Sequence, residues 1–269
     1  MTGPPDLPGT SGSIVKSLLA EAAVVGAALY YFGYLRTRAA FGYFGVDASV
    51  LKLGTQDYLL RSVNSVGIPL LVAAMIYFAA QVALVAAPRL GLRRLAGPLV
   101  PLAAAGVAGA LGLGGIAVGQ LLGGDQIGMA SALLLCVAFL LAGSGARRLR
   151  SEELDRVAFA AYAGAVVLLF VAMTGFAGSI GRGDAARFAH SLRDQPAVTL
   201  RSADDLGLQG NGVQASTTPS THYAYRYDGL RLLARTGDQY LFVPPDWHRG
   251  VPVFVIPGGS GLRMDITAP

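Results

Sequence analysis

The chain has 269 residues, of which 53% are hydrophobic and only 14% are charged, and its formal net charge is +5. Its mean hydropathy of +0.52 is too high for an ordinary soluble domain. The positive charges lie in short clusters at the ends of apolar stretches and form no single basic face. Membrane topology therefore explains them better than nucleic-acid binding does.

Five apolar stretches are long enough to cross a bilayer, because about 20 residues at about 1.5 Å per residue span the hydrocarbon core. They cover residues 14–35, 63–87, 99–122, 127–145 and 157–180. The Pro/Gly/Ser-rich residues 1–13 are predicted to be disordered. No charged n-region or cleavage site accompanies the first stretch, so we expect a retained anchor. The predicted fold class is a membrane all-α helical bundle of about five transmembrane helices, residues 14–180, with a small C-terminal antiparallel β domain.

The orientation of the helices follows from arginines in the short loops. These loops hold Arg89, Arg93 and Arg94 after the second stretch, and Arg147, Arg148, Arg150 and Arg156 after the fourth. Placing both loops inside predicts a multi-pass plasma-membrane protein with a cytoplasmic N-terminus and an extracytoplasmic C-terminal domain. The positive residues of the first loop oppose this choice, but that loop is longer.

The first loop, residues 36–62, is aromatic and basic. Phe41, Tyr43 and Phe44 alternate with glycine, so this piece is too short and too broken for a span and suits the membrane surface. Asp47 is predicted to cap a short turn, and Thr55 to begin the helix of the second span. The loop is either an outward-facing recognition or gating element or an interfacial segment that packs its rings on neighbouring helices. Phe41, Tyr43, Phe44 and Asp47 are therefore candidate interaction residues.

Two features within the spans are candidates for a functional role. Gly115, Gly119 and Gly123 make two G-x-x-x-G steps on one face of the third span, where small residues let helices approach closely. This stripe serves packing within the chain, contact with a second copy, or the lining of a pore. Glu21 is the ionisable residue deepest in a span. It is either a buried proton or ion site or a group that reaches the inner interface.

The C-terminal part changes to a period of two. Residues 181–221 are predicted to be a short helix and a linker, and residues 222–269 a small domain of four to five strands with Asp-Gly and Gly-Asp turns. Trp247 and Arg249 lie in a Pro-rich segment of this domain. Both residue types are favoured at binding hot spots, so both are candidate interaction residues, although a tryptophan that caps a small core is the simpler explanation.

No stretch carries a recognisable reaction chemistry. His190, His222 and His248 are far apart and lack Cys, Asp or Glu partners at metal-ligand spacing. Cys136 is the only cysteine, so an intramolecular disulfide is excluded. The Arg182-Gly183-Asp184 triplet is interpreted as a chance match to an adhesion motif. The sequence thus predicts no catalytic, cofactor-binding or metal-ligating residue.

The layout resembles that of uncharacterised bacterial multi-spanning membrane proteins with a small C-terminal β domain. The FGYFGVDASVL loop, the DYLLRS entry to the second span and the YDGLRLLARTGDQYLFVPPDW tail carry this resemblance, which implies no activity. We expect an envelope-facing sensor, scaffold or accessory subunit that acts through protein contacts. The alternatives are a small oligomeric channel or carrier and, third, an integral membrane enzyme. The expected partners are the lipid bilayer and either a second copy or another membrane protein, with no nucleic acid.

Overall fold

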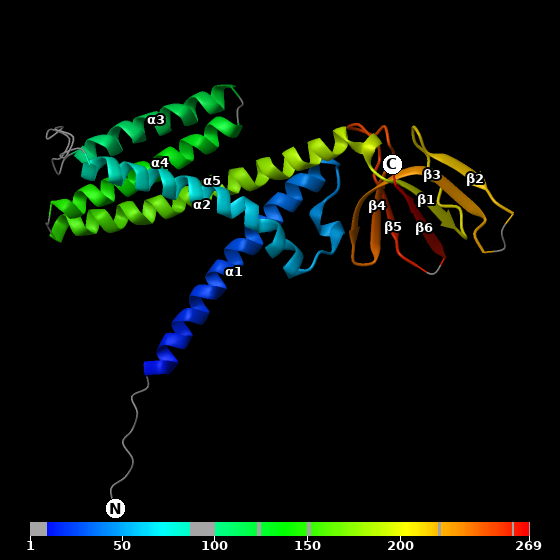
Figure 1. Cartoon of the computed structure of the whole chain (residues 1–269), viewed down its shortest axis with the longest axis horizontal. Coiled ribbons are helices and arrows are strands. Elements are labelled where there is room, and N and C mark those ends of the chain that lie inside the picture. The colour runs from blue at the N-terminus through cyan, green and yellow to red at the C-terminus, as the bar shows by residue number, and fades with distance from the viewer. Residues whose placement is uncertain are drawn as a thin grey trace, which may run out of the picture.

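The computed structural model describes residues 10–86, 100–122, 125–149, 152–219, 222–259 and 261–268. Within these residues the chain is mostly helical, with five long helices followed by a small C-terminal antiparallel sheet, as predicted. The molecule is elongated, with the helices at one end and the sheet at the other (Figure 1). All five helices are long and apolar enough to cross a membrane.

The helices follow the apolar stretches, but their ends differ from the predicted ones. They are α1 (Thr10–Tyr43), α2 (Thr55–Ala86), α3 (Val100–Leu122), α4 (Asp125–Arg148) and α5 (Glu152–His190), with the short 3-10 helices η1 (Ala48–Leu51) and η3 (Leu192–Asp194). α1 takes in the end of the predicted tail and the start of the predicted loop, because a helix continues wherever packing or lipid supports it. Residues 1–9, and with them most of the predicted tail, lie outside the described residues.

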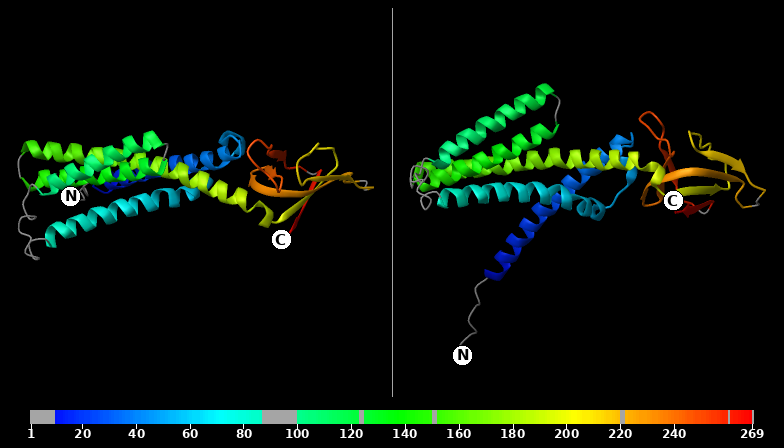
Figure 2. Two further views of the ribbon diagram at one scale, coloured as in Figure 1. Left: turned by 90° about the horizontal axis from the view of Figure 1, so that it is seen from above. Right: turned by 45° about the horizontal axis from the view of Figure 1, so that its top comes forward.

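Helix α5 is the element on which the others are assembled. α1, α2 and α4 all contact it, and α3 packs on α4. α1 crosses α2 and α5 at glycines: a Cβ on Gly33 would overlap the carbonyl oxygen of Tyr58 on α2, and one on Gly181 of α5 would overlap that of Arg36 on α1. Beyond these crossings the N-terminal half of α1 diverges from the bundle, as both Figure 1 and the right-hand view of Figure 2 show.

The sheet begins earlier in the chain than predicted. Its six described strands are β1 (Ala197–Ser202), β2 (Gln214–Thr217), β3 (Tyr225–Thr236), β4 (Gln239–Val243), β5 (Phe254–Pro257) and β6 (Leu262–Thr267). The strand order is β5-β4-β3-β1-β6, and β2 also pairs with β3. β1 and β2 fall within residues 181–221, which were predicted as helix and linker. β1 lies centrally because it pairs with both β3 and β6, and its alternating Val198 and Leu200 are buried.

An ion pair within β3 is joined to β1 by a hydrogen bond. Arg226 donates from Nε to Asp228 Oδ2 at 2.7 Å, and Thr199 on β1 donates to Asp228 Oδ1 at 2.6 Å. Partial burial would raise the pKa of the Asp228 carboxyl, but the hydrogen bonds from Arg226 and Thr199 outweigh burial and hold this pKa below its ordinary value. The ionised form of Asp228 is therefore the form that stabilises the sheet.

Asp228→Asn is expected to lower the melting temperature of the β domain near neutral pH and to lose this effect in acid. Because the folded pKa is depressed, the ionised carboxylate stabilises the fold above its ordinary pKa of 3.8, and this stabilisation is lost as the pH falls through the folded pKa. Melting of the full chain in detergent at pH 7 and pH 3 measures the difference. The control is Asp204→Asn, because the carboxylate of Asp204 is exposed and accepts no hydrogen bond within the described part of the chain. A deficit for Asp228→Asn that is equal at both pH values would contradict the assignment.

Candidate functional site

The first loop, the end of α5 and the β domain share one hydrophobic core, here called the docking core. Its buried members are Phe41, Phe44, Val46, Leu51, Ala185, Leu192, Leu241, Val243 and Trp247. The loop residues come from the end of α1, the connection to η1, and η1 itself, whereas the others come from α5, η3, β4 and the segment after β4. The docking core therefore joins the helices to the sheet.

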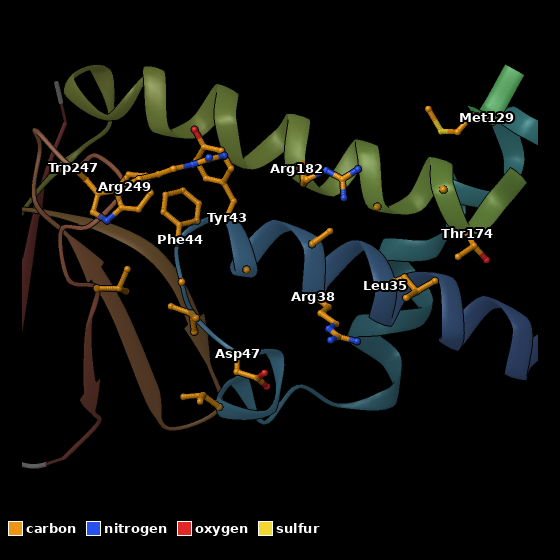
Figure 3. A pocket seen from close by; sticks show the side chains of 18 of the residues that line it. Leu35, Arg38, Tyr43, Phe44, Asp47, Met129, Thr174, Arg182, Trp247 and Arg249 are labelled. Carbon is orange, nitrogen blue, oxygen red and sulfur yellow. The ribbon is translucent and has the colours of Figure 1, made fainter. Parts of the chain in front are cut away.

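The two sets of candidate interaction residues, which are some 200 residues apart in the sequence, meet in this core. The Trp247 ring lies with its centroid 4.6 Å from that of Phe44 and 5.9 Å from that of Tyr43. The guanidinium of Arg249 lies 5.0 Å from the centroid of the Tyr43 ring, within cation–π range. Trp247 Nε1 donates a hydrogen bond to the carbonyl oxygen of Val251 at 2.9 Å. Figure 3 shows this aromatic group at the β-domain end of α5.

Asp47 has the local role that the sequence predicted. Its carboxylate accepts a hydrogen bond from the backbone N–H of Ser49 at 2.8 Å and so caps η1. Hydrogen bonding to Ser49 and the nearby positive charge of Arg38 lower the pKa of Asp47. The capped turn places Leu51, which is fully buried, in the docking core.

A polar contact between α1 and α5 was not found from the sequence. The half-buried Arg36 donates from Nη2 to Asp184 Oδ2 at 2.6 Å and from Nη1 to the carbonyl oxygen of Arg61 at 2.8 Å. Arg187 on α5 also donates to Asp184. Arg36 thus connects α1, α2 and α5 next to the docking core. Asp184, the last residue of the Arg-Gly-Asp triplet, is therefore engaged in a structural contact.

Two further contacts fix the β domain to the end of α5. Arg193 in η3 donates from Nε and Nη2 to Asp246 Oδ1 at 3.0 and 2.8 Å. Arg231 on β3 donates from Nε to the carbonyl oxygen of Leu192 at 2.9 Å. Because α5 leads through η3 directly into β1, these bonds restrain the only covalent connection between the helices and the sheet.

A long groove runs beside the docking core, here called the interfacial groove. Its volume is about 1780 Å³, and it is lined by residues of 35–50, 171–182 and 247–255, with Ile116 and Met129 from the neighbouring ends of α3 and α4. In Figure 3, Met129 and Thr174 mark its bundle end, Trp247 and Arg249 its β-domain end, and Arg38 and Arg182 lie between them. The candidate residues Tyr43, Phe44, Asp47, Trp247 and Arg249 all contribute to its lining.

The other candidate residues lie apart from this region. A Cβ on Gly115 would overlap Oγ of Ser131 on α4, so this part of the glycine stripe is engaged within the chain. The surroundings of Gly119 and the position of Gly123 lie outside the described residues. Glu21 is exposed on the diverging half of α1 and accepts a hydrogen bond from Ser17 Oγ at 3.2 Å.

The chemistry of the described residues offers no metal centre: no group of three or more His, Cys, Asp or Glu side chains among them could hold a metal ion. Cys136 is buried in α4. Comparison of the chain with known protein families, curated proteins and solved structures found no match. The docking core and the interfacial groove are therefore the features that bear on function.

Proposed function

We propose that the protein is an integral plasma-membrane protein that acts through contacts of its exported β domain with another envelope protein, as a scaffold or accessory subunit. The docking core is the observation that carries the proposal. A domain that works by contact must be presented at a defined height and angle, and here nine buried residues join it to the helices. A domain tethered by a flexible linker would lack this restraint.

The length of α5 supports the same role. Its 39 residues correspond to about 58 Å at about 1.5 Å per residue, which exceeds the hydrocarbon core of about 30 Å. Residues 157–181 carry no charged side chain, whereas Arg182, Asp184 and Arg187 follow in the last part of the helix. The end of α5 thus serves as a rigid stalk for the sheet.

We place the sheet outside the cell and the N-terminus inside, from the arginine distribution. The ends of α2 and α4 and the starts of α3 and α5 lie away from the β domain (Figure 1), so the helix ends that flank the two Arg-rich loops are on one side of the bundle. The α1–α2 connection and the β domain fall on the other. This arrangement satisfies the positive-inside rule for both short loops.

A single introduced cysteine tests orientation and partner together. Ile266 on the edge strand β6 is 58% exposed, and the native Cys136 is buried. On intact cells, Ile266→Cys should react with a membrane-impermeant maleimide, and a bifunctional thiol cross-linker should yield one recurrent adduct with a second protein. Trp247→Ala in the same chain should weaken this adduct, because the domain then loses its fixed position.

Arg147→Cys is the matched control, since Arg147 is exposed near the other end of the bundle. It should react only after the membrane is permeabilised. Labelling in the reverse pattern would overturn the orientation. Adducts of the chain with itself alone would favour the oligomeric alternative, and the absence of any recurrent adduct would reject a role through contacts.

A further inference from the structure

We infer that the interfacial groove holds an anionic phospholipid of the leaflet nearest the β domain. The acyl chains lie in the bundle half of the groove, and the phosphate lies among the arginines near its middle. This inference uses the membrane-spanning character of the helices and is independent of the proposed protein partner.

The position of the groove relative to the membrane supports this occupant. On α5 the uncharged stretch ends at Gly181, and on α1 an uncharged stretch ends at Leu35. Arg182 and Arg38 therefore lie at the level where the headgroups begin. Groove residues before this level, such as Val171 and Met129, lie at the depth of the hydrocarbon core, where lipid is the surrounding solvent.

The bundle half of the groove is apolar and is kept open by small residues. Ile116, Met129 and Val171 supply apolar surface. The glycines leave space: a Cβ on Gly128 would meet nothing within 4 Å, and a Cβ on Gly178 would meet only the end of the Arg182 side chain, at 3.5 Å. The helices on either side, α1 and α4, both pack on α5. The groove between them is open and not an enclosed cavity, so an acyl chain can enter it.

The middle of the groove and its β-domain end are positively charged. Its charged lining residues are Arg38, Arg182, Arg249 and Asp47, three cations against one anion. They come from α1, α5, the segment after β4 and the η1 cap, and Figure 3 shows the arginines along the groove. Arg38 and Arg249 are exposed, so their guanidinium groups can donate to phosphate oxygens.

This combination selects a lipid over other anions. A soluble phosphate would bind the arginines but leave the apolar half empty. A zwitterionic lipid such as phosphatidylcholine would fill the apolar half, but its choline cation offsets the charge of its phosphate beside the guanidinium groups of Arg38 and Arg249. The volume of about 1780 Å³ also exceeds the roughly 300–1,000 Å³ of pockets for small molecules. Basic pockets between transmembrane helices are known to recognise anionic headgroups.

Native mass spectrometry of the full chain in neutral detergent tests the inference. With added phosphatidylglycerol the wild-type chain should retain one lipid, with phosphatidylcholine it should retain much less, and inorganic phosphate should not displace the lipid. Arg38→Gln with Arg249→Gln should lower phosphatidylglycerol retention by about 25-fold, at about fivefold for each arginine near the headgroup. Arg235→Gln with Arg263→Gln, at exposed sites of the β domain outside the groove lining, should leave retention unchanged.

Gly128→Leu tests the apolar half, because leucine favours the helix, a Cβ on Gly128 meets nothing within 4 Å, and the leucine fills the groove away from the three arginines. It should lower retention of phosphatidylglycerol as well, with the melting temperature unchanged. Equal retention of the two lipids, no effect of the Arg38/Arg249 pair, or displacement by inorganic phosphate would overturn the inference. So would a polypeptide, in place of lipid, found bound to the groove of the purified chain.

Discussion

Gly33→Leu is expected to prevent α1 from packing on α2 and to cause the largest loss of stability of any single change considered for the bundle. A Cβ at this position already overlaps the backbone carbonyl of Tyr58, and a backbone atom cannot move aside as a side chain can. Overpacking of a core costs about 1–3 kcal/mol when neighbours can adjust, so the loss here should exceed about 3 kcal/mol. Unfolding of the full chain in mixed micelles of neutral detergent and dodecyl sulfate measures it.

Gly26→Leu is the matched control on the same helix. A Cβ on Gly26 meets nothing within 4 Å, so the same substitution about two turns earlier adds apolar surface toward lipid without a clash. It should leave the unfolding midpoint unchanged. If both variants are equally stable, α1 does not cross α2 at Gly33, and the arrangement of α1 described above is wrong.

The helices could be predicted from the sequence because lipid imposes a length and a polarity that do not depend on tertiary contacts. Each of the five apolar stretches lies almost wholly within one long helix. The ends of the helices were less predictable. α1 continues through Arg36, Thr37 and Arg38 to Tyr43, because the Arg36 side chain bonds to Asp184 and to the Arg61 carbonyl.

The site was predicted only in part. Aromatic clustering singled out Phe44 in the first loop and Trp247 in the β domain, but nothing in the sequence indicates that they touch. The pair of Arg36 and Asp184 is separated by 148 positions, and such pairing depends on how α5 lies against α1. β1 was missed because its six-residue alternation is short and follows a helix directly. Local patterns carry no information on contacts of this range.

Trp247→Ala is expected to release the β domain from the helices. Trp247 is only 8% exposed and contacts the rings of both Phe44 and Tyr43. Removal of a buried tryptophan costs about 3–5 kcal/mol, and the lost ring takes with it the hydrogen bond to Val251. Because the sheet keeps its own core around Tyr227, Leu230 and Phe242, the loss should fall on docking. Hydrogen exchange of the full chain should become faster in residues 41–51 and unchanged in β3.

Phe44→Ala, and the double variant that combines it with Trp247→Ala, test whether the effect arises from the contact between these two rings. If Phe44 and Trp247 act through each other, the double variant should be less destabilised than the sum of the single ones, with a coupling of about 0.5–1.5 kcal/mol for an aromatic pair. His248→Ala, at the exposed neighbouring position, should change neither stability nor exchange. Strictly additive effects, or faster exchange throughout β3, would mean that Trp247 stabilises the sheet itself and that the first loop does not hold the domain in place.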